Sequence, residues 1–197
     1  MEAEAALLRG QWTKARLLLE RARCRAEAQE QEYLLVCCDF LSLRLALLSE
    51  EDPAGKFDPG WAKARRAQVR QRHDTTLLLT FESALAYDAA VCGQQEDIPP
   101  FFAKHELHAF SILNPAKPML AMIENQVDLA QGEYARVIGR SDTLSRSCEK
   151  LHYGLVLLHV RLQTAAAYEK LGMRAEALTL LREAERLAAP DGILAPF

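Results

Sequence analysis

Apolar residues recur every three to four positions along most of the chain. Within Trp12–Ala28, for example, Ala15, Leu18, Leu19 and Ala22 fall on one stripe, which is the spacing of an amphipathic helix. No stretch alternates apolar and polar residues for long enough to predict a strand. The pattern therefore predicts an all-α protein.

Breaker residues divide this pattern into segments. Clusters of proline, glycine and acidic residues at 50–55 and of proline at 114–118 predict loops, and Asp58-Pro59 predicts a helix start. The expected helices cover residues 1–9, 12–28, 30–49, 60–73, 74–92, 98–113, 119–131, 134–147 and 149–171, with a last one that ends before Pro190.

These ten helices predict five pairs within a single domain, residues 1–197. The pairs are 1–29, 30–73, 74–113, 114–148 and 149–190, followed by an apolar tail at 191–197. The first pair is short, and Met1 leads directly into helix-forming sequence. We therefore expect the chain to be a piece of a larger protein.

The closing pair indicates the architecture. In Leu162–Pro190, two amphipathic segments flank a turn at Gly172, and Ala165, Ala177 and Ala184 lie where the helices would touch. Small residues at such a contact are typical of tetratricopeptide-type (TPR-like) hairpins. One hairpin cannot bury its own apolar face, so the fold class that we predict is a right-handed TPR-like superhelix, an α-solenoid of about five helix pairs.

Short repeated motifs support an array. W-x-K-A-R occurs at Trp12 and again 49 residues later at Trp61, and the turn at Gly132 recurs 40 residues later at Gly172. TPR arrays repeat at about 34 residues. The longer, uneven spacing predicts a divergent array.

Composition narrows the function classes. The net charge of −3 gives no electrostatic reason to expect nucleic-acid binding by the whole chain, and no apolar run approaches the roughly 18 residues of a membrane span. The five cysteines are odd in number and lie in helical segments. They are typical of reduced thiols, so we expect a cytoplasmic location.

The last 85 or so residues carry a resemblance to a known family. NPAKPMLAMIENQVDLAQGEYARVIGR (114–140) and the hairpin AYEKLGMRAEALTLLREAERLAAPDG (167–192) resemble the helical-repeat sensor region of MalT-type LuxR-family transcription regulators. Glu185 departs from that pattern, where an apolar residue is more usual. Positions 1–113 fit the array more loosely.

The resemblance implies a role and a domain context. Such regulators carry an ATPase, a helical sensor and a helix-turn-helix domain. This sequence has no G-x-x-x-x-G-K-[ST] motif, so the expectation is an isolated sensor without the ATPase and DNA-binding domains. DNA would then be bound only through a domain absent from this chain.

Two sets of residues are candidates for binding. In TPR-like stacks the first helix of each pair lines the inner groove, and alignment on the hinge glycines predicts the following groove residues: Thr80, Ser83, Tyr87, Met119, Met122, Gln126, His159, Leu162, Ala166 and Glu169. A basic run predicts a contact face, or alternatively a solvated outer face: Lys63, Arg65, Arg66, Arg70 and Arg72.

The sequence gives only weak indications of a catalytic or metal site. His105-Glu106-Leu107-His108 is H-E-x-H, not the H-E-x-x-H of zinc enzymes. Cys37-Cys38 is not C-x-x-C, and core filling explains the two cysteines better. We therefore expect no catalytic site, no metal and no cofactor.

The leading hypothesis is a non-enzymatic sensor and interaction domain. Its partner would be a small-molecule effector or a regulatory protein, with no membrane association and with homodimerisation left open. The alternative is a stand-alone TPR-like scaffold that binds a peptide or partner protein without a small-molecule effector.

Overall fold

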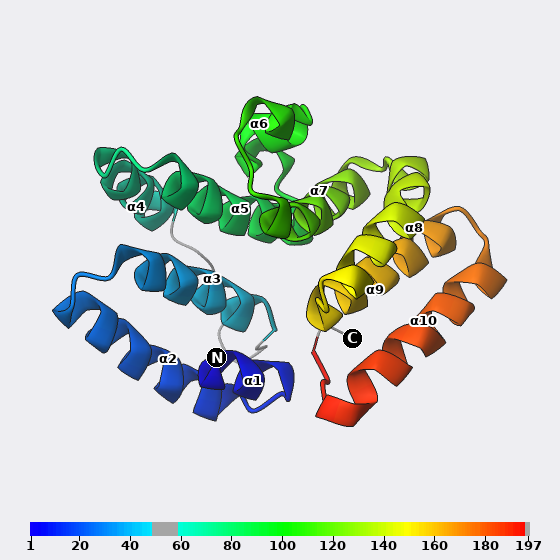
Figure 1. The fold of residues 1–197 in the computed structure, drawn as a ribbon, viewed down its shortest axis with the longest axis horizontal. Helices are drawn as coiled ribbons and strands as arrows, with labels where there is room; N and C mark the ends of the chain where they lie inside the picture. Colours follow the sequence, from blue (N-terminus) through cyan, green and yellow to red (C-terminus); the bar gives the residue numbers. More distant parts are fainter. Residues whose placement is uncertain (49–58, 196–197) are drawn as a thin grey trace. The chain divides into compact units, whose positions relative to one another are not determined.

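The computed structural model describes residues 1–48 and 59–195. Within these residues the chain forms ten α-helices and four short 3₁₀-helices, with no strand (Figure 1). The all-α prediction is confirmed. The predicted loop at 50–55 and the predicted cap Asp58 lie outside the described residues.

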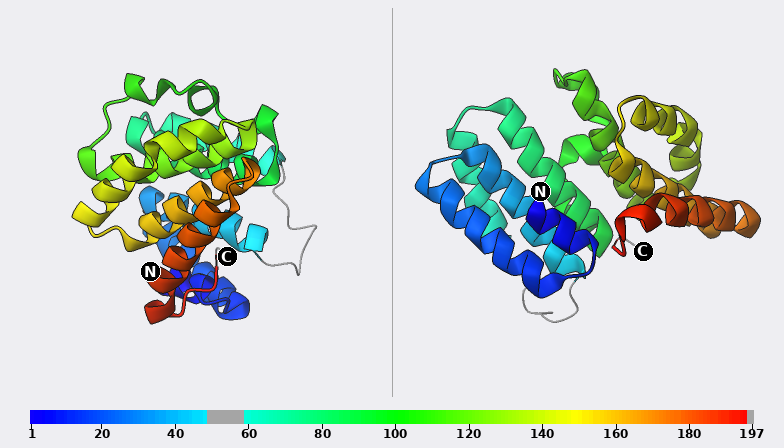
Figure 2. Two further views of the ribbon diagram at one scale, coloured as in Figure 1. Left: turned by 90° about the vertical axis from the view of Figure 1, so that its right-hand side faces the viewer. Right: turned by 60° about the horizontal axis from the view of Figure 1, so that its bottom comes forward.

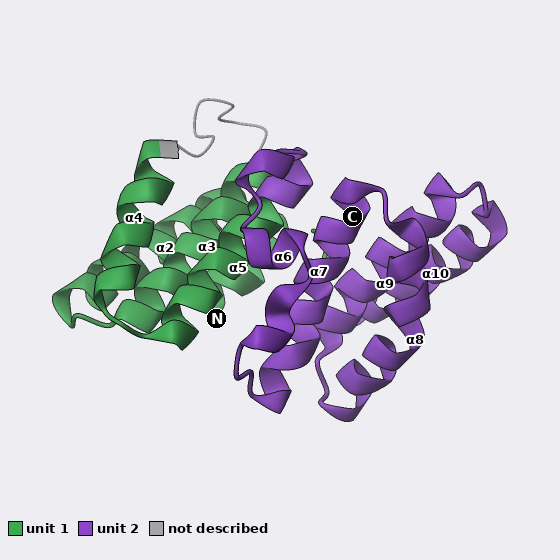
Figure 3. Cartoon of the chain, turned by 90° about the horizontal axis from the view of Figure 1, so that it is seen from above, with its two compact units in different colours: residues 1–88, 193–196 green, residues 89–192, 197 purple. Residues whose placement is uncertain are grey.

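The chain divides into two compact units at Asp88 (Figure 3). In the first unit, which also takes in residues 193–195, α2 and α3 lie side by side and antiparallel (Figure 2). Its helices are α1 (Glu2–Leu8), α2 (Trp12–Ala28), α3 (Glu32–Leu48), α4 (Pro59–Gln71) and the larger part of α5 (Thr75–Cys92).

The second unit covers residues 89–192, and in it α9 packs against α7, α8 and α10. None of the helices in the described part of the chain is long and apolar enough to cross a membrane. Beyond the end of α5, the elements of this unit are η1 (Gln95–Asp97), α6 (Pro100–Ala103), η2 (Glu106–Ala109), η3 (Asn114–Ala116), α7 (Lys117–Gln131), α8 (Tyr134–Lys150), α9 (Gly154–Lys170), α10 (Arg174–Ala188) and η4 (Ala189–Asp191).

One type of turn joins most consecutive helices. After α7, Gly132 has φ +79°, its N–H donates to the Leu129 carbonyl at 3.2 Å, and the Glu133 N–H donates to the Asp128 carbonyl at 2.8 Å. This is the Schellman arrangement, which satisfies the last carbonyls of a helix. The same pair of bonds closes α8, where His152 has φ +57°.

These turn residues recur at a constant spacing. Of the nine residues with positive φ in the described part of the chain, all but His105 lie 20 positions apart within three runs: Gly10 and Glu30; His73 and Gly93; and Gly132, His152, Gly172 and Gly192. A helix of 17 residues and a three-residue turn fill this interval, as α8 and α9 do. The structural repeat is therefore a hairpin of about 40 residues.

The W-x-K-A-R match does not follow this register. Trp12 is the first residue of α2 and lies 18 positions before the turn residue Glu30, whereas Trp61 lies 12 positions before the turn residue His73. The two motifs therefore occupy different places in their helices. The sequence match is not the structural repeat.

Two helix predictions differ from the structure. Residues 98–113 form no continuous helix, because Pro99-Pro100 sets the start of the single-turn α6 and His105 then adopts φ +58°. The predicted helix 149–171 begins only at Gly154, because α8 runs to Lys150 and the turn centres on His152. The sequence hides this turn because it contains no glycine at the left-handed position.

Each unit buries its own apolar residues. In the first unit, Leu7 and Leu19 pack with Leu45 in one cluster, and Phe81 packs with Val36 in another. In the second, fully buried alanines allow close packing of α9 and α10: Ala167, Ala177 and Ala184. Ala177 and Ala184 are two of the small residues that the sequence analysis predicts at the interface of the closing hairpin.

Candidate functional site

A buried carboxylate lies at the centre of the first unit. Asp39 on α3 is fully buried, and each of its oxygens accepts a charged hydrogen bond. Arg23 Nη1 on α2 donates to Oδ1 at 2.8 Å, and Arg65 Nε on α4 donates to Oδ2 at 2.8 Å. A buried carboxylate requires such partners. Asp39 therefore ties together the helices on either side of α3.

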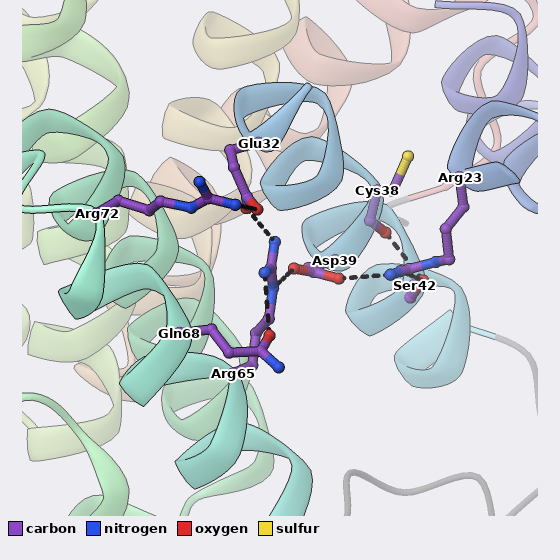
Figure 4. Close-up of polar contacts among 8 residues, drawn as sticks. All are labelled: Arg23, Glu32, Cys38, Asp39, Ser42, Arg65, Gln68 and Arg72. Atoms are coloured by element: carbon purple, nitrogen blue, oxygen red, sulfur yellow. Dashed lines mark hydrogen bonds and ion pairs between the residues drawn. The ribbon is translucent and has the colours of Figure 1, made fainter. Parts of the chain in front are cut away.

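The network continues from Arg65 toward the ends of the helices. Arg65 Nη2 donates to Glu32 Oε2 at 3.2 Å, and Arg72 Nη2 donates to Glu32 Oε1 at 2.8 Å. Figure 4 shows the resulting row of alternating charges, Arg23, Asp39, Arg65, Glu32 and Arg72, from three helices. Neighbouring charges in the row are opposite in sign, so each side chain is attracted to the next.

Side-chain oxygens complete the row. Arg23 Nη2 donates to Ser42 Oγ at 3.1 Å, and Arg65 Nη1 donates to Gln68 Oε1 at 3.3 Å. Burial acts to lower the pKa of Arg65, but hydrogen bonds and charge from Asp39 and Glu32 outweigh it and raise the pKa above its ordinary value. Arg65 is therefore held permanently cationic.

A pocket of about 540 Å³ lies along this row. Its size falls in the range of about 300–1,000 Å³ typical of small-molecule sites. Two of its lining residues are apolar, Leu35 and Trp61. The other eight are polar or charged: Arg23, Glu27, Glu32, Asp39, Arg65, Gln68, Gln71 and Arg72. The pocket is suited to a polar ligand.

The predicted basic run on α4 divides into two sets. Arg65 and Arg72 line the pocket. Arg66 instead forms a bidentate pair with the buried Glu82 at 2.7 and 2.9 Å, and Arg70 approaches the same carboxylate at 3.8 Å. Lys63 is exposed. Four of the five basic side chains thus pair with buried or half-buried acids on neighbouring helices.

The two buried acids of the first unit occupy equivalent positions. Asp39 lies nine residues after the turn residue Glu30, and Glu82 lies nine residues after the turn residue His73. Each pairs with an arginine 16 positions earlier in the chain, Arg23 or Arg66. The same arrangement of acid and arginine therefore occurs twice in the first unit, between α2 and α3 and between α4 and α5.

The predicted groove residues of the first unit are largely engaged locally. Thr80 is exposed and its hydroxyl donates to the Thr76 carbonyl at 2.8 Å, while the buried Ser83 donates to the Leu79 carbonyl at 2.6 Å. The ring of Tyr87 packs edge-on against Phe40 at 6.3 Å. Burial raises the pKa of the Tyr87 hydroxyl.

The other predicted groove residues lie in the second unit. Gln126 on α7 is half-buried and its Oε1 accepts a bond from Gln163 at 3.1 Å. Met122 and His159 are buried and Leu162 is half-buried, whereas the remaining three are exposed: Met119, Ala166 and Glu169. That all ten residues line one groove stays a prediction.

A second polar cluster surrounds Asp128 on α7. This carboxylate is fully buried, accepts a bond from Arg140 Nη2 at 3.0 Å and lies 3.4 Å from His105 Nε2. Arg136 Nη1 lies 3.8 Å from Asp128 and contacts His105 Nε2. Burial raises the pKa of Asp128, although Arg140, His105 and Arg136 act to lower it.

Two neighbours on α7 enlarge this cluster. Asn125 is fully buried and its Oδ1 accepts a bond from Arg140 at 2.8 Å, but its Nδ2 has no hydrogen-bond partner. Burial also raises the pKa of Glu124, which lies 3.9 Å from both Arg140 and His105. The cluster joins η2 to α7 and α8 and accounts for the position of His105.

The remaining candidate histidines and cysteines do not come together. His108 is exposed, and His152 is a turn residue. Cys37 is exposed and Cys38 is buried; burial raises the pKa of both thiols, which favours the unreactive protonated form. Residues 1–48 and 59–195 contain no group of three or more His, Cys, Asp or Glu side chains placed to hold a metal ion.

The sequence analysis missed the buried acids that bind arginines: Asp39 and Glu82 in the first unit and Asp128 in the second. Asp39 and Glu82 each stand among apolar residues in a helix that is otherwise strongly hydrophobic. An acid at a core-facing position of such a helix is a signal, because its burial demands a cationic partner.

Comparison with known proteins gave no relative. No protein-family model, no curated protein and no solved structure matches the chain.

Proposed function

We propose that this chain is a non-enzymatic, effector-sensing and protein-interaction domain of a LuxR-family bacterial transcription regulator. The observation that carries the proposal is the polar pocket of about 540 Å³ around the buried Asp39. Its walls come from three successive helices, α2, α3 and α4. A ligand there would contact all three.

The regular turns support a TPR-like solenoid as the finer description of the fold. A helix-turn interval of 20 residues gives hairpins of about 40 residues, longer than the 34 residues of the TPR repeat. Stacked hairpins of equal length are the basis of a superhelical array. We propose that the superhelix is right-handed. We also propose that the protein is located in the cytoplasm.

The mechanism that we propose is a population shift. A bound ligand stabilises the arrangement of α2, α3 and α4 in which it makes the most contacts, and an equilibrium moves only by the difference in affinity for its two states. In MalT-type regulators, which the sequence resembles, ATP hydrolysis and DNA binding belong to other domains. We assign neither to this chain.

A ligand screen tests the sensing role. Metabolites at millimolar concentration, including sugars, organic acids, amino acids and phosphate esters, are added to the full chain, and its melting temperature is measured. A genuine ligand raises the melting temperature with increasing concentration, because it binds the folded state. If no compound does so, while a regulatory protein binds with micromolar affinity or better, the small-molecule version is wrong.

The alternative function is a scaffold for a peptide or partner protein. It is favoured by apolar residues exposed on α10 and the turn before it: Leu171, Met173, Leu178, Leu181 and Leu187. Exposed apolar residues gathered in one region are typical of interaction surfaces. A charge at Leu178 would then abolish partner capture and leave ligand-induced stabilisation unchanged.

A further inference from the structure

Each oxygen of the two acids in the charged row already accepts a hydrogen bond from an arginine. Asp39 Oδ1 and Oδ2 accept from Arg23 and Arg65, and Glu32 Oε1 and Oε2 accept from Arg72 and Arg65. A cationic ligand group at these carboxylates would lie beside the arginines that bind them, and like charges repel. The interior of the row therefore disfavours a cation.

The arginine at the outer end of the row is open instead. Of the five N–H groups of a guanidinium, Arg72 uses one, from Nη2, on Glu32. Its side chain is 56% exposed, and it lines the pocket. Arg72 thus presents unused donors, in the fork that matches a carboxylate.

The charges of the pocket lining balance, so the pocket does not repel an anion. Three arginines alternate with two acids along the row. Glu27 is a third acid at the pocket wall and makes the lining neutral. The preference for an anion therefore rests on the unused donors of Arg72. The pocket also lies beside the C-terminal turns of α2 and α4, which contribute Glu27, Gln71 and Arg72. Helix C-termini disfavour concentrated negative charge, so a singly charged anion fits better than a phosphate dianion.

The rest of the wall adds selectivity. Gln71 is exposed beside Arg72, and its amide can donate and accept. Trp61 and Leu35 form the apolar part of the wall. A ligand with a short carbon skeleton and additional hydroxyl or amino groups would meet all of these groups.

We propose that this pocket binds a small polar organic molecule through its carboxylate, which Arg72 holds with a bidentate hydrogen bond. The proposal rests on the sensing role proposed above and names the ligand class. Glu27 and the glutamines face the hydroxyl or amino groups of the ligand, and Trp61 covers its carbon skeleton. The ligand class is organic acids and amino acids.

A matched pair of variants tests the assignment. Arg72→Gln removes the open guanidinium, whereas Arg70→Gln removes a similarly exposed arginine two residues earlier, in the last turn of α4, that does not line the pocket. Binding of pyruvate, lactate, glutamate and glycine is measured by calorimetry and thermal shift. Maltose, trehalose, inorganic phosphate and glycerol phosphate form the comparison set.

The expected result is that at least one carboxylate binds the full chain. Arg72→Gln weakens this binding tenfold or more, and Arg70→Gln changes it less than twofold. Arg72→Lys, which keeps the charge but not the fork, gives an intermediate loss. This third variant also tests the proposal if Arg72→Gln fails to fold.

Other outcomes overturn the proposal in distinguishable ways. If only a neutral sugar or a phosphate binds, or if Arg72→Gln and Arg72→Lys leave carboxylate binding intact, the ligand assignment is wrong while the sensing role stands. If no compound of any class binds, the small-molecule sensing role itself is wrong.

Discussion

Residues in the left-handed conformation end most of the helices. For two of them, Gly132 and His152, substitution should change the stability in opposite directions. Gly132 has φ +79° and His152 has φ +57°. A side chain at Gly132 would meet no atom within 4 Å, so the cost of Gly132→Ala is conformational only, about 1 kcal/mol of unfolding free energy. His152→Gly relieves the same strain and should stabilise by up to about 1 kcal/mol. Urea unfolding measures both.

Gly139 provides the control for these two substitutions. It lies inside α8, has no positive φ, and has open space around an added Cβ. Gly139→Ala should therefore stabilise the protein by about 1 kcal/mol. If Gly132→Ala stabilised the protein as much as Gly139→Ala does, the left-handed turn would be wrong.

The sequence revealed only part of this turn system. Gly132 and Gly172 were recognisable because glycine is the usual residue at such positions. Glu30, His73 and His152 adopt the same conformation without a compositional signal. Their places follow only once the 20-residue interval is known, and that interval was obscured by the W-x-K-A-R match.

Asp88 predicts a pH dependence of stability. Burial raises the pKa of its carboxyl from 3.8 to about 6. Between these values the folded state holds a proton that the unfolded state has lost, so the free energy of unfolding contributed by Asp88 falls as pH rises through this window. The loss should be about 1–2 kcal/mol above pH 6, because the half-buried side chain keeps some contact with water.

Asp88→Asn removes this dependence, because the amide does not ionise. The variant should exceed the wild type in stability by about 1–2 kcal/mol at pH 7.5 and match it near pH 4. Urea unfolding at a series of pH values measures the difference, with Asp142→Asn at an exposed position on α8 as the control. A difference that does not vary with pH would contradict the assigned pKa shift.

At the scale of the helix, arginines hold neighbouring elements through buried acids. Arg65 on α4 is 11% exposed and contacts both Asp39 and Glu32. Arg65→Met leaves Asp39 with one cation fewer and should cost about 3 kcal/mol, the effect of breaking a buried ion pair. Lys63→Met, at an exposed position on the same helix, should stay within about 0.5 kcal/mol.

Chemical unfolding of both variants separates the two effects. If Arg65→Met and Lys63→Met lowered the free energy of unfolding equally, the charge of Arg65 would contribute nothing. Arg65 would then act only through packing of its aliphatic stem, which methionine retains. An Asp39→Asn variant then distinguishes charge from shape, because it retains the volume of the carboxylate and loses its charge.

The apolar pattern largely predicted where the helices lie. It did not predict which side chains of neighbouring helices pair. The helix Trp12–Ala28 has the predicted bounds, because Gly10 precedes its apolar stripe and the polar residues 29–32 follow it. The basic run on α4 was visible in the sequence, but its division between Asp39 and Glu82 depends on which helices become neighbours. Such pairings arise from tertiary packing and are not encoded by periodicity.

At the scale of the whole molecule, the boundary between the two units falls at Asp88, inside α5. The sequence predicted a single array, and no breaker marks this position. A continuous helical pattern cannot show a boundary that contacts alone define. Such a boundary should limit how far the effect of a destabilising substitution extends along the chain.

In a helical array each element depends mainly on its neighbours, so a core defect should act locally. Val160 on α9 is fully buried, and α9 packs against α7, α8 and α10. Val160→Ala should cost about 2 kcal/mol and speed amide hydrogen exchange in those four helices, while α1, α2 and α3 keep their wild-type rates. Val91→Ala, at an exposed position, should leave all rates unchanged. An equal acceleration in every helix would instead show that the whole chain unfolds as one cooperative unit, and would contradict the helical array that we propose.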